Sequence, residues 1–387
     1  MKVVEWSAFV AAPLAGMTLA LLGAEVIKVQ PKRGAPDQGR WPLSEEGASL
    51  FWHELNKAKQ TVTWDFSDTA SHEAFVDLLA HNGRILISSL PLPDPVSIVR
   101  LKERIPDLIV LELQGHPDGS PAVDYTVQAM TGWPEATGPS QGAEPINNPV
   151  PTWDIATGYL AAVSVLAAVD RRRRTGAGAH IRLALTDVAL STMCGLGLAA
   201  EVALTGATTR ARFGNNVYGT FGQDFQTRDG HRVMVVAVTR RQWTAFVNAI
   251  GVAADLAKLS ETTGLKLDDE GHRFRLREEI RLICAPWFLD RDVDGIAAVL
   301  DRAGILWSRY RSIAEALSDP SRFTHGTDIV ETIDHPGVPP VPTAGLPLRL
   351  VDEPRLATAP SPEAVRASAH DGDKNMIASA DDGRRPK

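Results

Sequence analysis

The sequence predicts an α/β protein, with a large domain built on a mainly parallel sheet and a smaller α+β domain after it. The first observation is length, because 387 residues exceed what one hydrophobic core usually holds. The second is that short apolar strands alternate with helical segments through the first half of the chain, which is typical of βαβ units with helices on both faces of a sheet. The third is that this alternation stops after about residue 205, where a hairpin pattern replaces it.

The alternation begins at the N-terminus. Val3 and Val4 form a short apolar strand, and Pro13 opens a helix at a position where its missing N–H costs nothing. Gly23 ends this helix, and the next strand covers residues 24–29. Further strands are expected over residues 60–66, 84–90, 108–114 and 181–185, and further helices over 70–80, 96–104, 154–174 and 188–204.

The second half of the chain predicts a smaller domain. Residues 218–227 and 231–238 form the strands of a β-hairpin around the tight turn Asp229-Gly230. Two amphipathic helices, a strand and a short helix follow, over residues 273–287, 293–303, 305–307 and 313–317. The domain expectations are a large domain over 1–204, a small domain over 205–325, a return segment to the large domain over 326–358, and a poorly ordered tail over 359–387.

Composition and charge argue against several classes of protein. The net charge of −7 and the pI near 5.8 provide no general attraction for nucleic acid or an anionic membrane. The uncharged stretch 6–24 is bracketed by Glu5 and Glu25 and interrupted by Pro13, which argues against a membrane helix or a signal peptide. Two cysteines cannot build a disulfide framework, so we expect a cytoplasmic protein. The ten histidines show no metal-ligand spacing, so we expect no metal.

Asp154 is the strongest catalytic candidate. It precedes an Ala-rich helical pattern, which makes it a candidate N-cap. At that position the helix amides and dipole would hold its carboxylate ionised, and an ionised, partly desolvated carboxylate is what nucleophilic catalysis of acyl transfer needs. The alternative is a plain structural cap, which is the commoner role of such a residue.

Basic residues near the expected strand ends are candidate phosphate ligands. Lys57 and Lys59 stand between a helix and a strand, and Lys28, Lys32 and Arg33 lie around the end of the second strand. Ligands of α/β sheets usually bind near strand ends. Solvation at the surface explains any one of these side chains equally well.

Short segments in a fixed order resemble the class III CoA-transferases. The segments that carry the resemblance are Val3-Val4-Glu5, Ala11-Ala12-Pro13, 22–29, 55–59, 154–158, 174–178 and Leu185-Thr186-Asp187. The similarity extends over roughly residues 1–350, and these motifs in this order are specific to that family.

The resemblance implies a Rossmann-like large domain paired with a small domain, in two chains that interlock as a homodimer. It also implies that Asp154 attacks an acyl-CoA thioester and then carries CoA as an aspartyl-CoA thioester. No cofactor is implied beyond the CoA of the substrate. The CoA contacts implied by the resemblance are Val10, Ala11, Lys32, Arg33, Lys57 and Lys59.

Finer matches resemble a branch of the family that moves CoA between the C1 and C4 carboxyls of mesaconyl-CoA. These matches lie in residues 5–13, 123–127, 153–155, 218–225 and 232–236. They imply that Asp124, Tyr125 and Tyr218 contact the substrate.

Departures from the family pattern narrow the chemistry. Val123 stands where racemases of the family carry a histidine, so a base needed for stereoinversion is absent. Val10 stands where formyl-CoA transferases have a glutamine, which argues against a formyl or oxalyl substrate. The usual C-terminal motif of the family is not recognisable after Arg355. Two alternatives to the intramolecular reaction stay open: CoA transfer from another acyl-CoA to a free acid, and CoA binding without catalysis.

Overall fold

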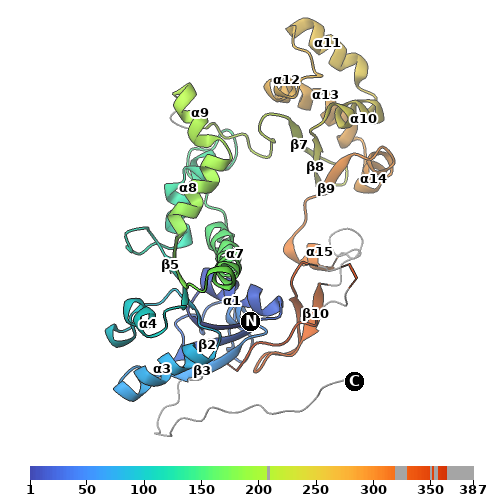
Figure 1. The fold of residues 1–387 in the computed structure, drawn as a ribbon. Helices are drawn as coiled ribbons and strands as arrows, with labels where there is room; N and C mark the ends of the chain where they lie inside the picture. Colours follow the sequence, from blue (N-terminus) through green and yellow to red (C-terminus); the bar gives the residue numbers. More distant parts are fainter. Residues whose placement is uncertain (207–209, 319–328, 349–350, 353–355, 364–387) are drawn as a thin grey trace. The chain divides into compact units, whose positions relative to one another are not determined.

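The computed structural model describes residues 1–206, 210–318, 329–348, 351–352 and 356–363 (Figure 1). The chain forms two compact units. The first contains residues 1–131 and 148–200 and the described residues after 327. The second contains residues 132–147 and the described part of 201–326. Its border near 200 lies close to the expected one, but the loop 132–147, which the sequence analysis placed in the large domain, belongs to the second unit.

The first unit is built on a six-stranded parallel sheet, as the sequence predicts. Its strands are β1 (Lys2–Trp6), β2 (Glu25–Pro31), β3 (Gln60–Trp64), β4 (Ile85–Ser88), β5 (Ile109–Gln114) and β6 (Ala179–Ala184). Their order in the sheet is β3-β2-β1-β4-β5-β6. The strands that follow β1 in the sequence lie on both sides of it, so the strand order reverses between β1 and β4. Ligands of such sheets bind outside the carboxyl ends of the strands at that point.

One face of the sheet is covered by α1 (Ala11–Leu21) and α7 (Thr152–Thr175). Small and branched side chains such as Ala15, Leu19 and Val165 form this part of the core. α1 and α7 also pack against each other, because their small residues let the two helices approach closely. This unit also contains α2 (Leu50–Asn56), the 3₁₀ helix η1 (Asp94–Val96), α5 (Asp124–Met130) and α8 (Leu185–Gly195).

The other face is covered by α3 (Thr69–His81) and α4 (Ile98–Arg104), which bury Phe75 and Leu101 against the sheet. A strand covered on both faces needs apolar side chains in both directions. β4 fulfils this requirement, because all its residues are buried. The prediction of a parallel sheet with helices on both faces is therefore confirmed.

α1 and α7 approach each other closely at Gly158. A Cβ atom at this position would lie 2.8 Å from the carbonyl oxygen of Ala11 and 2.9 Å from Cδ2 of Leu14. Gly158 is one helical turn after Asp154. The glycine thus brings the start of α1, which directly follows the β1 loop, beside the first turns of α7.

The second unit contains a three-stranded antiparallel sheet in the order β7-β8-β9. β7 (Phe221–Gln226) and β8 (Arg232–Ala237) form the predicted hairpin, and β9 (Leu306–Arg309) pairs with β8. The helices of this unit are α6 (Trp133–Ala136), α10 (Arg240–Ile250), α11 (Ala253–Thr263), α12 (Glu270–Arg275), α13 (Arg277–Leu289), α14 (Val293–Arg302) and α15 (Ile313–Ser318). The sequence analysis expected no element where α10 and α11 lie.

The apolar segment that the sequence predicts as one helix over 188–204 is divided. α8 ends at Gly195, and α9 (Leu198–Thr205) continues at an angle of 62°. Gly197 has a φ of 80°, a left-handed conformation that glycine adopts without a steric penalty. This glycine ends α8, so the prediction of a continuous helix is wrong.

The C-terminal described residues belong to the first unit. β10 (Val330–Ile333) and β11 (Val341–Ala344) form an antiparallel pair. The amide of Ala58 donates to the carbonyl oxygens of residues 359 and 360, and Ser361 is buried against His53 at 2.6 Å. The expectation of a poorly ordered tail is therefore wrong for residues 359–363, which pack on α2. The rest of that expected tail, residues 364–387, lies outside the described residues.

We predict that Gly158→Val lowers the free energy of unfolding of the first unit by about 2–3 kcal/mol, because its side chain would overlap the Ala11 carbonyl and overpack the contact between α1 and α7. Urea unfolding followed by far-UV circular dichroism measures this loss. Gly195→Ala is the matched control, since a Cβ at that helical position meets nothing within 4 Å. An unchanged urea midpoint in Gly158→Val would show that the helices separate without cost.

Candidate active site

Asp154 lies in the first turn of α7, at the third helical position. The helix begins at Thr152 and Pro151 occupies the N-cap, so the expectation that Asp154 caps the helix is wrong. The Asp154 side chain is half-buried. Its carboxylate accepts no hydrogen bond from the residues that the structure describes. The candidate nucleophile is therefore free to face a ligand.

The cap of α7 comes from α5. Oδ2 of Asp124 accepts hydrogen bonds from the backbone N–H of Trp153 at 2.6 Å and of Asp154 at 3.1 Å. Its Oδ1 accepts one from Nε2 of Gln128 at 2.5 Å. Asp124 is 2% exposed, so its carboxylate is satisfied by these hydrogen bonds inside the protein and not by water. The resemblance implied that Asp124 contacts the substrate, whereas the structure uses its carboxylate to satisfy the free amides at the helix start.

The surroundings of Asp154 favour its protonated form. Burial and the nearby carboxylate of Asp124 raise the pKa of Asp154 to about 6, and the guanidinium of Arg40 partly opposes this rise. The sequence analysis expected the helix dipole to hold the carboxylate ionised, and the direction of the pKa shift is the opposite. Above pH 7 the group is still mainly ionised, and its raised pKa makes it a stronger base than an exposed aspartate.

The loop after β1 lies where the strand order reverses. Phe9 has a φ of 68°, which is rare for a bulky residue. Its N–H donates to Oδ2 of the buried Asp37 at 2.9 Å, which holds this conformation. The loop leads into α1, where the predicted CoA contacts Val10 and Ala11 form the N-cap and the first helical residue. Among the described residues no side chain caps α1, so its first amide groups have no side-chain acceptor there.

A buried charge cluster lies beneath this loop and consists of Glu5, Ser7, Lys28 and Lys59. The Glu5 carboxylate lies 2.9 Å from the ammonium groups of both lysines, and Lys28 also donates to the carbonyl of Ser7 at 3.0 Å. Burial raises the pKa of Glu5, but the two lysines outweigh it and the net pKa is lowered. Gly16 leaves the space that the carboxylate fills, because a Cβ there would lie 1.7 Å from Oε2 of Glu5.

The predicted role of Lys59 as a CoA contact does not fit its position. Its side chain is fully buried, and its ammonium donates to Glu5, to the carbonyl of Pro13 at 2.8 Å and to Oδ1 of Asn56 at 2.9 Å. These three partners use all three N–H groups of the lysine. The structure therefore assigns Lys59 to the cluster beneath α1. Lys57 is also largely buried and pairs with Glu54 at 2.8 Å.

The other predicted site residues lie at the surface. Lys32 and Arg33 are exposed directly after β2, as a phosphate contact requires. Tyr125 follows Asp124 on α5, and its hydroxyl donates to the carbonyl of Pro149 at 2.9 Å. Tyr218 lies in the second unit, where its hydroxyl donates to Glu201 at 2.8 Å. The substrate roles of the two tyrosines stay predictions.

Arg40 is not among the site residues that the sequence predicts. Its guanidinium lies over the rings of Phe9 and Phe51, with 5.9 and 5.0 Å to the ring centres. Its positive charge also lowers the pKa of Asp154, against the larger effects of burial and Asp124. No motif surrounds this arginine, since it stands in a loop rich in Gly and Pro. Only the position of that loop between β2 and α2, near the reversal of strand order, could have suggested it.

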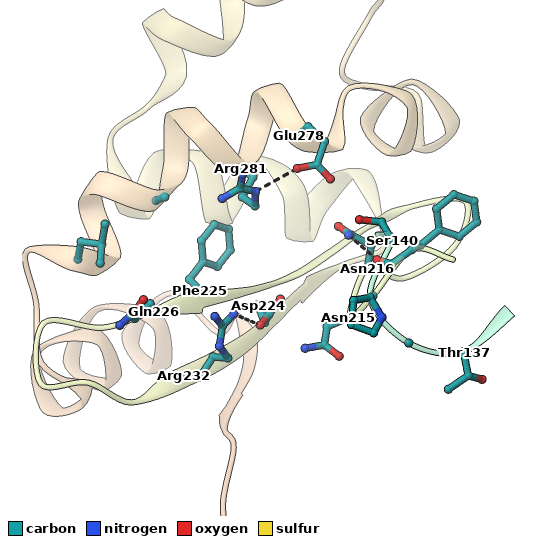
Figure 2. Close-up of a pocket in the computed structure, with 16 residues that line it drawn as sticks. Thr137, Ser140, Asn215, Asn216, Asp224, Phe225, Gln226, Arg232, Glu278 and Arg281 are labelled. Carbon is teal, nitrogen blue, oxygen red and sulfur yellow. Dashed lines mark hydrogen bonds and ion pairs between the residues drawn. The ribbon is translucent and has the colours of Figure 1, made fainter. Parts of the chain in front are cut away.

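A separate pocket of about 720 Å³ lies in the second unit (Figure 2). It contains two ion pairs, between Arg232 and Asp224 and between Arg281 and Glu278. Phe225 and the amides of Asn215, Asn216 and Gln226 line it as well. Both carboxylates that line this pocket, Asp224 and Glu278, are paired with an arginine. Among its described lining residues the pocket therefore offers no unpaired carboxylate comparable to Asp154.

The described residues supply no cluster of metal ligands, and the one buried cysteine is not an activated thiol. No group of three or more His, Cys, Asp and Glu side chains in the part of the chain that the structure describes is arranged to hold a metal ion. Burial raises the pKa of the Cys284 thiol to about 12, which makes it a poor nucleophile. Asp154 and its neighbours are therefore the candidate reactive groups of the site.

Comparison with known proteins extends over nearly the whole chain. The sequence model of CoA-transferase family III matches residues 1–365. The chain is 39% identical over 366 residues to 2-methylfumaryl-CoA isomerase from Chloroflexus aurantiacus, across 94% of this chain and 89% of that protein. It is 27% identical over 381 residues to succinyl-CoA:mesaconate CoA-transferase from Haloarcula marismortui, across 94% and 91% of the two chains.

Solved structures share the fold. A CAIB/BAIF family protein from Brucella suis matches with a TM-score of 0.73 and 24% identity, over 94% of this chain and 95% of that chain. Rv3272 from M. tuberculosis matches with a TM-score of 0.75 and 22% identity, over the same shares. The predicted fold class is therefore confirmed for both halves of the chain.

We predict that Asp154→Asn stabilises the protein by an amount that grows as pH rises from about 4 to about 6. The folded state holds the Asp154 proton more tightly than the unfolded chain, so stability falls as pH rises from about 4 to about 6. Removing the charge should raise the free energy of unfolding by about 1–2 kcal/mol at pH 7.5 and by only about a third of that amount at pH 4.5. Urea unfolding at both pH values measures the difference.

Asp170→Asn is the control for this experiment, because Asp170 lies exposed on the same helix and pairs with Arg174. It should show no gain at either pH. A gain of equal size at pH 4.5 and 7.5 in Asp154→Asn would contradict the raised pKa.

Proposed function

Because the chain belongs to CoA-transferase family III, we propose that it moves CoA between the C1 and C4 carboxyls of mesaconyl-CoA, also named 2-methylfumaryl-CoA. The observation that carries this proposal is the 39% identity to the isomerase of that substrate over 94% of the chain. The site supplies matching chemistry, since the Asp154 carboxylate is half-buried, accepts no hydrogen bond from the described residues and is mainly ionised above pH 7.

In the first half of the reaction, an Asp154 oxygen attacks the thioester carbonyl and the C–S bond breaks. This step yields a mixed anhydride between the aspartate and the acyl group, together with CoA thiolate. The thiolate then attacks the Asp154 carbonyl, which releases the substrate carboxylate and leaves CoA on the aspartate as a thioester. Each step exchanges one activated acyl group for another, so the sequence needs no ATP.

In the second half, the other carboxylate of the same diacid attacks the aspartyl-CoA thioester. The anhydride forms again through that carboxyl, the thiolate attacks the substrate carbonyl, and Asp154 leaves as a free carboxylate. Because the acceptor never leaves the site, its effective concentration greatly exceeds that of a dissolved acid. The product carries CoA on the opposite carboxyl, and the enzyme returns to its starting state.

Asp124 supports this chemistry without taking part in it. By accepting the amides of Trp153 and Asp154, it prevents the nucleophile from turning back onto its own helix. Its charge also raises the pKa of Asp154, which increases the basicity of the attacking oxygen.

Intermolecular transfer is the second candidate, because several relatives carry that activity in their names. They include succinyl-CoA:mesaconate CoA-transferase and succinyl-CoA--D-citramalate CoA-transferase. The same Asp154 chemistry would serve it, with a free acid as acceptor. Incubation with one purified monothioester separates the two candidates, since only the intramolecular reaction proceeds without added acid.

We also propose that two copies of the chain associate as a homodimer. The class III resemblance implies such a dimer, and exposed apolar side chains on neighbouring helices support it. These side chains are Leu160, Val163 and Leu166 of α7 and Leu190 of α8, each at least 42% exposed. Apolar side chains grouped in this way are typical of a protein interface.

We predict that mesaconyl-C1-CoA alone is converted to mesaconyl-C4-CoA, and that Asp154→Asn lowers this turnover at least ~10³-fold. The substitution keeps size and fold but removes the nucleophile. Product thioesters separated by liquid chromatography measure the rate, and mass spectrometry of the wild type should detect the aspartyl-CoA adduct. Asp170→Asn should retain the full rate. A requirement for added free acid would assign the intermolecular reaction instead.

We predict that Lys32→Ala and Arg33→Ala each raise KM for the acyl-CoA about 5–30-fold with little change in kcat, because contact with a CoA phosphate stabilises ground and transition states equally. The effect should shrink as salt rises from 50 to 500 mM, since the residues are exposed. Lys258→Ala, in the exposed face of α11, is the control. Unchanged KM in both variants would place the phosphate contacts elsewhere.

A further inference from the structure

Arg40 is an exposed arginine that lies over two aromatic rings and has no charge partner among the described residues. Its guanidinium lies over Phe9 and Phe51, whose rings restrict its movement through cation–π contacts. Its side chain forms no ion pair and donates no hydrogen bond to the described residues, although its backbone carbonyl accepts one from Ser49. A planar guanidinium held in this way keeps its N–H groups available for an anion.

The arginine belongs to the same site as the nucleophile. Phe9 stands two residues before Ala11, and the Ala11 carbonyl packs on Gly158, one turn after Asp154. The charge of Arg40 acts on the Asp154 carboxylate as well. Arg40 and Asp154 nevertheless form no ion pair with each other, so the guanidinium is not occupied by the nucleophile.

We propose that Arg40 binds the substrate carboxylate that is not bonded to CoA, and thereby selects dicarboxylic acyl groups. This inference rests on the proposed function. The guanidinium presents two parallel N–H groups that fit the two oxygens of a carboxylate. The aromatic rings on which it lies would contact the carbon skeleton between the two carboxyls.

The reaction needs such a contact most between its two halves. After CoA has moved to Asp154, the diacid carries two free carboxylates and has no covalent bond to the protein. Arg40 would hold one carboxylate while the other faces the aspartyl-CoA thioester. Exchange of the two carboxylates at the arginine turns the diacid end for end and allows CoA to return to the opposite carboxyl.

A matched pair of substrates tests the proposal at pH 8, where Asp154 is ionised. Tigloyl-CoA has the branched, unsaturated skeleton of mesaconyl-C1-CoA, with a methyl group in place of the free carboxylate. In Arg40→Gln we expect single-turnover formation of aspartyl-CoA from mesaconyl-C1-CoA to fall about 10–100-fold, as for loss of a charged hydrogen-bonded pair. Formation from tigloyl-CoA should change less than about threefold.

Two further variants complete the design. Arg40→Lys keeps the charge without the planar fork and should lose only about 3–10-fold with mesaconyl-C1-CoA. Arg241→Gln, an exposed arginine on α10, removes the same charge elsewhere and should leave both rates unchanged. Equal loss with both substrates in Arg40→Gln would overturn the proposal, because the arginine would then act on Asp154 or on CoA.

A second substrate pair separates failure of this inference from failure of the proposed function. Succinyl-CoA and butyryl-CoA differ by the same replacement of carboxylate with methyl. If the wild type loads CoA from succinyl-CoA but does not isomerise mesaconyl-C1-CoA, the proposed function fails, and selective loss with succinyl-CoA in Arg40→Gln still supports the arginine. If loading from succinyl-CoA and butyryl-CoA falls equally in that variant, the arginine proposal fails by itself.

Discussion

The capping of one helix by a carboxylate from another is the constraint on which the site depends. The first amides of α7 need an acceptor, and an aspartate within the first turn would ordinarily supply it. Here Asp124 of α5 accepts hydrogen bonds from the backbone N–H groups of Trp153 and Asp154. Two carboxylates then lie at one helix end, so their repulsion and the loss of water outweigh the helix dipole at Asp154. The start of α7 is thereby capped by Asp124, and the carboxylate of Asp154 is not needed as a cap.

Local patterns predicted most of the fold because local chemistry decides it. The strands of the parallel sheet are short apolar runs, since both faces are covered. The hairpin of the second unit follows from Asp229-Gly230, a turn that needs few residues to specify. α10 was missed although Thr239 and Gln242 form a capping box at its start. The break at Gly197 was missed because glycine within an apolar helix gives no sign of its φ value.

The site was less predictable because its decisive contacts join distant parts of the sequence. The order of motifs identified Asp154, but a single sequence does not show which of two carboxylates accepts the helix amides. Lys59 and Glu5 are separated by 54 positions and meet only when α1 covers the sheet. The sequence therefore predicted Lys59 as a phosphate ligand, whereas in the structure it pairs with the buried Glu5. Arg40 carried no motif, and only its stacking on two aromatic rings distinguishes it from a solvated arginine.

The return of the chain to α2 has a consequence for how the protein is made on the ribosome. The first unit consists of residues 1–131 and 148–200 together with β10, β11 and the segment at Ser361, which follow the second unit in the sequence. More than a hundred residues must be translated between these parts, which takes on the order of ten seconds. During this interval the sheet exists without the segment that covers His53 and α2. The contiguous part of the second unit can fold in this time, so the N-terminal unit is the last to be completed.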